Sequence, residues 1–83
     1  MYAWVVYVQY EFDGVANIEG VFTSEEKAYE GFCRIVSFVE HMERKQVERL
    51  INFEPFGAGS MRLVCQEETF YCVRLEADGM LEK

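Results

Sequence analysis

The chain has 83 residues, 51% of them hydrophobic and 28% charged, so it fits one small folded domain over residues 1–83 and not a disordered segment. It holds 15 acidic and 8 basic residues, a formal net charge of −7 at pH 7. A surface of that sign repels phosphate, so we expect no direct binding to nucleic acid or to an anionic membrane. The same charge suits a basic protein partner, or simply keeps a small protein in solution.

The chain carries three cysteines, Cys33, Cys65 and Cys72. An odd number without a Cys-x-x-Cys spacing is not typical of a secreted domain held by disulfides, so we expect buried free thiols in a reducing cytoplasm. No basic segment precedes the first apolar run, and Gln9 and Glu11 interrupt it. The sequence therefore predicts neither a signal peptide nor a transmembrane helix, and a cytoplasmic location.

Residues 2–12 are β-branched and aromatic, which predicts a strand. Its first half is apolar on both faces, with Trp4 and Val6 on one side and Val5 and Tyr7 on the other. That pattern is typical of a central strand or of one whose back forms an interface. The Asp-Gly pair at 13–14 then predicts a hairpin turn, and a more polar edge strand should follow over about 16–22.

Residues 23–53 are predicted to form the helical part of the chain. Thr23 is expected to cap a helix and to form a capping box with Glu26. A stripe of apolar residues at helical spacing extends from Ala28 to Met42, and the polar run at 43–46 interrupts it. We therefore predict two helical segments, roughly 24–41 and 44–53. The alternative is one long helix whose second half packs on another subunit.

Pro55 should end the helix, and the Gly-rich stretch to residue 60 is typical of a flexible loop. Strands are predicted at 61–65 and 69–77, again apolar on both faces, with a final turn at 78–79. The sequence thus predicts an α+β fold: a four-stranded antiparallel sheet in the order ββ-α(α)-ββ, with the helices mainly on one face. Such a sheet would leave apolar side chains on its other face in water unless a second protein covers them.

A resemblance to a known family rests on three features: the aromatic and valine-rich strand, the Asp-Gly turn, and the stretch GVFTSEEKA at 20–28. Together they resemble the opening of a family of small uncharacterised bacterial and phage domains. Residues 70–76 resemble the closing strand of that family. The resemblance covers about half of the chain and implies a hairpin joined to a helix. It supplies no catalytic residue, and residues 39–61 have no counterpart in it.

No group of residues points to catalysis. His41 is the only histidine and has no nucleophile or orienting acid at a recognisable spacing. The three cysteines and His41 lack the spacing of a zinc module. The glycines at 57 and 59 lack the Gly-Lys-Ser/Thr ending of a phosphate-binding loop. We therefore expect no enzymatic activity, no catalytic residue, no metal and no cofactor.

The expected function is protein binding. The leading hypothesis is a small acidic inhibitor of the phage type, an anti-defence protein or nucleic-acid mimic that binds a basic or nucleic-acid-binding host protein. The alternative is a homodimeric regulatory or housekeeping module that self-associates through apolar surface. The acidic candidates for partner binding are Glu11, Asp13, Glu19, Glu67 and Glu68. The candidate interface residues are Val5, Tyr7, Met42, Val47, Leu50, Ile51 and Phe56.

Overall fold

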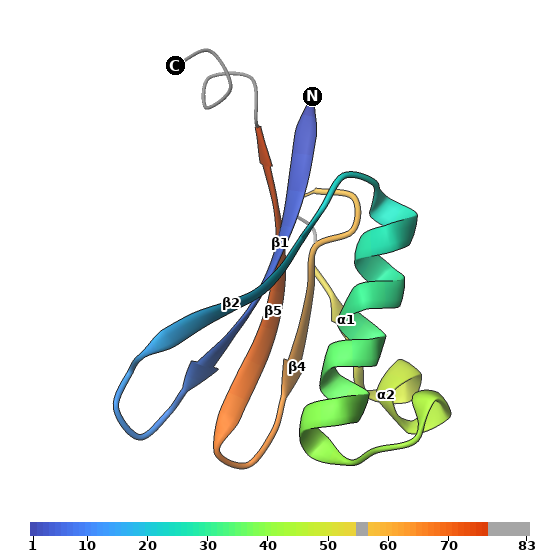
Figure 1. The fold of residues 1–83 in the computed structure, drawn as a ribbon. Helices are drawn as coiled ribbons and strands as arrows, with labels where there is room; N and C mark the ends of the chain where they lie inside the picture. Colours follow the sequence, from blue (N-terminus) through green and yellow to red (C-terminus); the bar gives the residue numbers. More distant parts are fainter. Residues whose placement is uncertain (55–56, 77–83) are drawn as a thin grey trace.

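The computed structural model describes residues 1–54 and 57–76. Within these residues the chain forms five strands and two helices (Figure 1). In chain order they are β1 (Tyr2–Tyr10), β2 (Ala16–Phe22), α1 (Glu25–Glu40), α2 (Arg44–Leu50), β3 (Asn52–Phe53), β4 (Met61–Val64) and β5 (Glu68–Glu76). The expected interface residue Phe56 and the expected turn at 78–79 lie outside the described residues.

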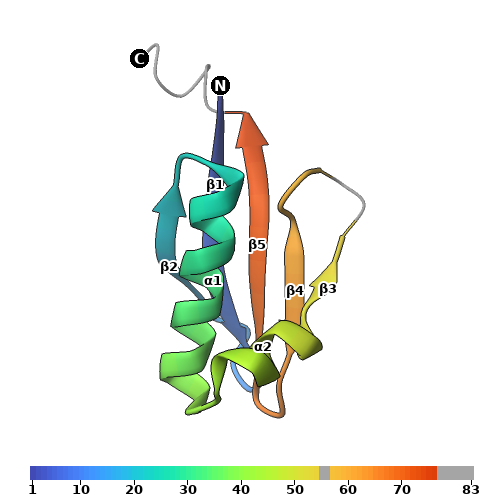
Figure 2. The same ribbon diagram turned by 90° about the vertical axis from the view of Figure 1, so that its right-hand side faces the viewer.

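The strands form one antiparallel sheet in the order β2-β1-β5-β4-β3 (Figure 2). The α+β prediction is confirmed, but the count of four strands is wrong because β3 adds a fifth. The second helix was expected to reach residue 53, yet it ends at Leu50. Ile51 is already extended and is buried in the core, so the next two residues run alongside β4.

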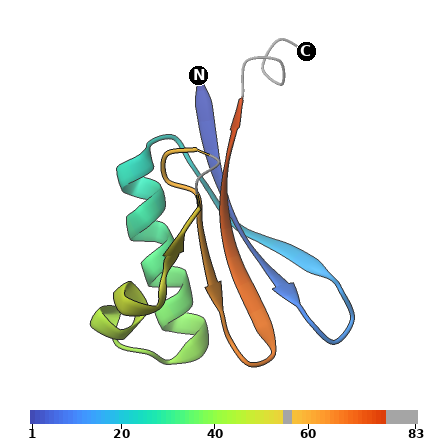
Figure 3. The ribbon, with the colours of Figure 1, turned by 180° about the vertical axis from the view of Figure 1, so that it is seen from behind.

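β1 pairs with β2 on one side and with β5 on the other, so it is an interior strand, as its double-sided apolar pattern predicts. The middle strand of the sheet is β5. Trp4, Val6 and Val8 of β1 are buried. Both helices cover that same side of the sheet, and the other side carries no helix (Figures 1 and 3).

The cap of α1 is Ser24 and not Thr23. The Ser24 hydroxyl accepts a hydrogen bond from the backbone N–H of Lys27 at 3.1 Å, and its backbone is extended with φ −144° and ψ 155°. Thr23 lies in the bend between β2 and the helix. The predicted capping box is therefore wrong, because the residue three positions after Ser24 is Lys27, which has no carboxylate to complete the box. β2 continues to Phe22, so the chain needs Thr23 to turn before a residue can cap the helix.

The break between the helices is confirmed at His41. This residue adopts the left-handed conformation with φ 56° and ψ 43°, and its backbone N–H donates to the carbonyl oxygen of Ser37. Beyond the break, Arg44 fixes α2 to α1. Its guanidinium group binds both carboxylate oxygens of Glu30 at 3.1 Å and lies 5.6 Å from the centre of the Tyr29 ring. The second helix thus folds back against α1, with Val47 in the core, and does not project away from the domain.

The core lies between the sheet and the helices. Its buried members are Trp4, Val6, Val8, Ala28, Phe32, Cys33, Val36, Val47, Ile51, Met61, Leu63, Phe70 and Cys72. Gly31 lets α1 lie close to the sheet, because a Cβ there would meet the ring of Phe22 at 2.1 Å. The core therefore lies on one side of the sheet only, the side that the helices cover.

Residues 57–60 form a packed turn, where the sequence predicted a flexible loop. The indole N–H of Trp4 donates to the carbonyl oxygen of Ala58 at 2.8 Å. The backbone N–H of Ser60 donates to the carbonyl oxygen of Gly57 at 3.0 Å, and Gly59 has a φ of +87°. A side chain at Gly59 would also meet the Trp4 ring. Glycine therefore permits both the turn and its contact with the core.

Candidate protein-binding surface

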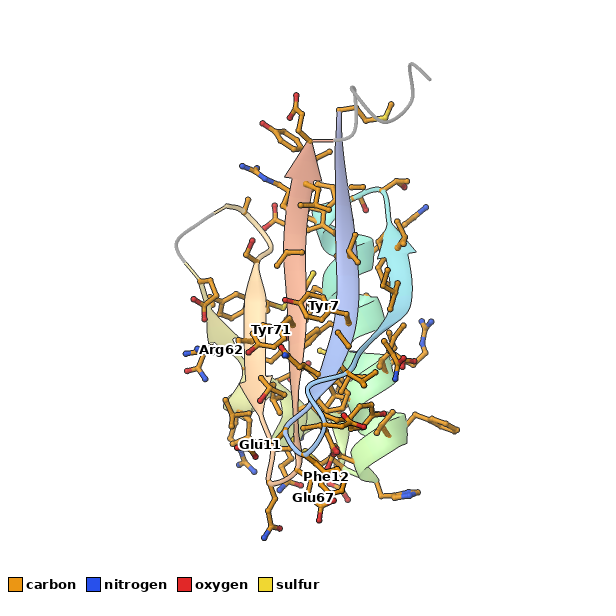
Figure 4. All side chains as sticks on the ribbon, turned by 90° about the vertical axis from the view of Figure 1, so that its left-hand side faces the viewer. Tyr7, Glu11, Phe12, Arg62, Glu67 and Tyr71 are labelled. Atoms are coloured by element: carbon orange, nitrogen blue, oxygen red, sulfur yellow. The ribbon has the colours of Figure 1, made fainter. Side chains whose placement is uncertain are left out.

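The side of the sheet that the helices leave uncovered carries mainly apolar side chains (Figure 4). In antiparallel pairs, residues directly opposite each other point to the same face. The pairing of Val5 with Val21 and Val73, and of Tyr7 with Ile18 and Tyr71, therefore extends one face across three strands. We call this surface the open face. Its members on the four long strands are Ala3, Val5, Tyr7, Gln9, Ala16, Ile18, Val21, Arg62, Val64, Thr69, Tyr71, Val73 and Leu75.

Two tyrosines form the centre of the open face. The rings of Tyr7 and Tyr71, from neighbouring strands, stack with their centroids 4.9 Å apart and their planes 19° apart (Figure 4). Burial, and then the nearby Tyr71, raise the pKa of the Tyr7 phenol above its usual value. Tyr7 therefore stays protonated and remains a hydrogen-bond donor. The pair is an aromatic platform of the kind found at protein interfaces.

Large apolar side chains on the open face are exposed to solvent. Ile18 is 70% exposed, Val21 61% and Val64 61%. Arg62 is the only charged residue among the members defined above, and its Nε lies 3.4 Å from a carboxylate oxygen of Glu54. A contiguous apolar patch with so little charge is typical of a surface that another macromolecule covers.

An acidic tip adjoins the open face where the two long hairpins end. Glu11 and Phe12 follow β1, and Glu67 lies in the turn between β4 and β5 (Figure 4). The backbone N–H of Glu11 donates to the carbonyl oxygen of Glu67 at 3.0 Å, which ties the hairpins together. With Tyr10, Asp13 and Gln66 they line a hollow of about 520 Å³. Phe12 is 89% exposed beside it.

The structure brings together three of the five predicted acidic residues, Glu11, Asp13 and Glu67. Glu19 lies apart from them. The pairing shifts by one residue between Val6 and Tyr7, which leaves Glu19 as the unpaired residue of a bulge in β2. Glu68 is half-buried and lies beside Glu40 on the helix side of the sheet.

The predicted interface residues also divide into separate groups. Val5 and Tyr7 lie on the open face, as expected for an uncovered strand. Val47 and Ile51 are buried in the core, so their place in the predicted interface is wrong. Met42 is half-buried against that core, and Leu50 is 44% exposed on α2. Of the two apolar residues of α2, Val47 thus packs in the domain's own core, whereas Leu50 stays partly exposed.

The site prediction missed Ile18 and Val21, although both belong to the open face. Gly20 and the bulge at Glu19 break the alternation of β2, so counting residues along this strand assigns Ile18 to the wrong side. In the last hairpin the alternation puts Val64 and Tyr71 on one face, and the register shows that this face is opposite the buried Leu63 and Phe70. That alternation was the signal that could have added them to the site.

All three cysteines are free thiols, buried at Cys33 and Cys72 and half-buried at Cys65. No group of three or more His, Cys, Asp or Glu side chains in the described part of the chain could hold a metal ion. Burial raises the pKa of Cys72 to about 11. Burial and the neighbouring carboxylates of Glu40 and Glu68 raise the pKa of Cys65 to about 11 as well. Both thiols therefore stay protonated at neutral pH, which makes them weak nucleophiles.

Glu40, at the end of α1, gives the fold a specific pH dependence. A hydrogen bond to the Glu68 carboxyl group, burial, and the charges of Glu68 and Glu67 raise the pKa of Glu40 to about 7. One of its oxygens is buried and has no hydrogen-bond partner within the described residues. Between the unfolded value of 4.5 and this raised value, the folded chain keeps a proton that the unfolded chain loses. Stability should therefore fall as pH rises through that interval.

Replacing Glu40 with Gln should remove this loss. Because solvent reaches part of the side chain, we expect the variant to be more stable than the wild type by about 1 kcal/mol near pH 8, with little gain near pH 5. Urea unfolding at both pH values measures the difference. Glu26→Gln, which removes an exposed carboxylate from the other end of α1, is the control. An equal effect of Glu40→Gln at both pH values would contradict the assignment.

No protein-family model, curated protein or solved structure matches the chain. Among the described residues, no helix is long and apolar enough to cross a membrane. The case for a function therefore depends on the geometry of the open face and of the acidic tip.

Proposed function

We propose that this chain is a non-enzymatic protein-binding module whose open face is the docking surface. The observation that carries the proposal is the uncovered apolar sheet around the Tyr7–Tyr71 stack. A side chain such as Ile18, which is 70% exposed, stabilises this fold little, whereas its burial against a partner is favourable.

The shape of the surface favours a macromolecule over a small ligand. Small molecules bind in concave pockets that bury most of their surface. The open face is instead the side of a β-sheet, with side chains from four strands exposed along it. A second protein layer would pack on it as one sheet or helix packs on another inside a domain.

The acidic tip supports a second candidate function, binding to a basic protein. Glu11, Asp13 and Glu67 surround one hollow, and no ion pair joins them to a basic side chain within the described residues. A partner that places Lys or Arg beside the exposed ring of Phe12 would gain from both charge and cation–π contact. This is the mode expected of a phage-type inhibitor of a basic host protein.

Photo-cross-linking tests which surface binds. A benzophenone amino acid replaces Val21 on the open face in one variant and Phe38 in the other. Phe38 is 81% exposed on α1, the side of the domain away from the open face, and is the matched control. We expect the Val21 variant to form protein adducts in a cell lysate and the Phe38 variant to form few.

The same experiment includes two further arms. Val64→Lys, on the open face but away from the probe, should abolish the Val21 adducts if that face is the docking surface. Adducts from Phe38 alone would contradict the proposal. Glu11→Lys with Glu67→Lys should abolish adducts at low salt if the tip binds a basic partner, and this loss should be weaker at about 500 mM NaCl.

A further inference from the structure

We infer that the occupant of the open face is a second copy of this chain, so that two sheets pack face to face around their Tyr7–Tyr71 stacks. The inference rests on the proposed function, because it names the partner of the same surface. It follows from where the charges lie, from the size of the face and from its symmetry.

Acidic residues are unevenly distributed between the open face and the rest of the surface. The chain has 15 acidic residues, yet none of the paired positions that define the open face is acidic, and the nearest carboxylates are Glu19 in the bulge of β2 and Glu54 beside Arg62. A surface that had to attract a basic partner would gain from carboxylates on it. A neutral apolar face instead lets two chains of net charge −7 approach each other without placing like charges in contact.

The area of the open face fits a second copy of the chain. Four strands about 4.8 Å apart, with roughly seven residues of about 3.3 Å each, give a face of roughly 400 Å² in projection. Projecting side chains such as Ile18 and Val64, which are 70% and 61% exposed, make the area that a partner can cover larger than this projection. A stable interface of standard size buries about 800 Å² per partner. The open face therefore suffices for a modest dimer.

The open face is also suited to two-fold symmetry. The Tyr7–Tyr71 stack lies on the two inner strands of the four, so a two-fold axis near it superimposes one open face on the other. If that axis runs across the strands, the acidic tips come to opposite ends of the dimer and their charges stay apart. Arg62 lies toward the β4 side of the face, beside its own Glu54, so it enters the interface with a countercharge.

Sedimentation of the purified chain from about 2 to 200 µM tests the inference. We expect a species of twice the 9.8 kDa chain mass at the upper end, dissociating on dilution. Ile18→Lys and Val64→Lys should each raise the dissociation constant by about tenfold or more, because each introduces a charge into the apolar interface. Phe38→Lys, the same kind of change on exposed helix surface, should alter it less than about twofold. Circular dichroism checks that each variant is folded.

The outcomes separate this inference from the proposed function. If the chain stays monomeric at the highest concentration, the inference that a second copy occupies the open face is overturned. Cross-linked protein adducts from the Val21 variant would then still support the open face as the docking surface. A dimer whose dissociation constant is unchanged by both Ile18→Lys and Val64→Lys overturns the inference alone, since its interface lies elsewhere and the Val21 cross-links still decide whether the open face binds a protein. A dimer that loses affinity with these two variants, and persists at about 500 mM NaCl, supports both.

Discussion

Alanine in place of Phe70 should lower the free energy of unfolding by about 4 kcal/mol, whereas alanine at the adjacent Tyr71 should lower it by only about 1 kcal/mol. The two residues are neighbours on β5 and point to opposite sides of the sheet. Phe70 is fully buried beneath the helices, and its removal would leave a cavity. Tyr71 is half-buried and would lose its stack with Tyr7.

The affinity for the partner should depend strongly on Tyr71, although the stability of the fold depends on it little. Tyr71→Ala removes part of the platform at the centre of the open face, so we expect the affinity for the partner to fall by at least about tenfold. Urea unfolding and the cross-linking yield from Val21 measure the two effects on the same samples. Equal losses of stability at both positions would show that both sides of the sheet are packed, and would contradict the distinction between core face and open face.

Aspartate in place of Val47 should unfold the domain, with a loss of about 4 kcal/mol or more, because it buries a carboxylate without a partner. Val47 has no exposed surface and is the residue through which α2 enters the core. The test bears on the second helical segment, for which the sequence left open a place at an interface with another subunit.

Leu50→Asp is the matched control, since Leu50 is on the same helix, is 44% exposed and receives the same charge. We expect it to change stability by less than about 1 kcal/mol. Circular dichroism and thermal unfolding of the two variants provide the comparison. If Val47→Asp folds as well as Leu50→Asp, α2 does not close the core as described.

Local patterns predicted much of the fold. The alternation of β1 and the stripe of α1 are set by residues close in sequence, and the polar run at 43–46 marked the break that His41 makes. β3 was missed because its two residues form a strand only when β4 lies beside them. The helix is capped by Ser24 and not by the predicted Thr23, because the length of β2 decides where the helix begins.

The binding surface was harder to predict, because it combines residues from four strands. Val5 and Tyr7 were found from the apolar back of β1, but Ile18 depends on the bulge at Glu19, which only strand pairing defines. Glu11 and Glu67 are far apart in the sequence, and a backbone hydrogen bond between two hairpins brings them together. Such contacts follow from tertiary register, which no local pattern specifies.

The most direct test of the open face as a docking surface is the solvent exposure of its methyl groups in the bound state. In methyl NMR spectra with a soluble paramagnetic agent, the signals of Ile18, Val21 and Val64 should broaden in dilute samples of the free chain. They should be protected once the chain is bound, to itself or to a captured protein. Val39 and Leu50, exposed on the helices, should broaden equally in both states. Protection of the helix methyls, with the open-face methyls still broadened, would contradict the account.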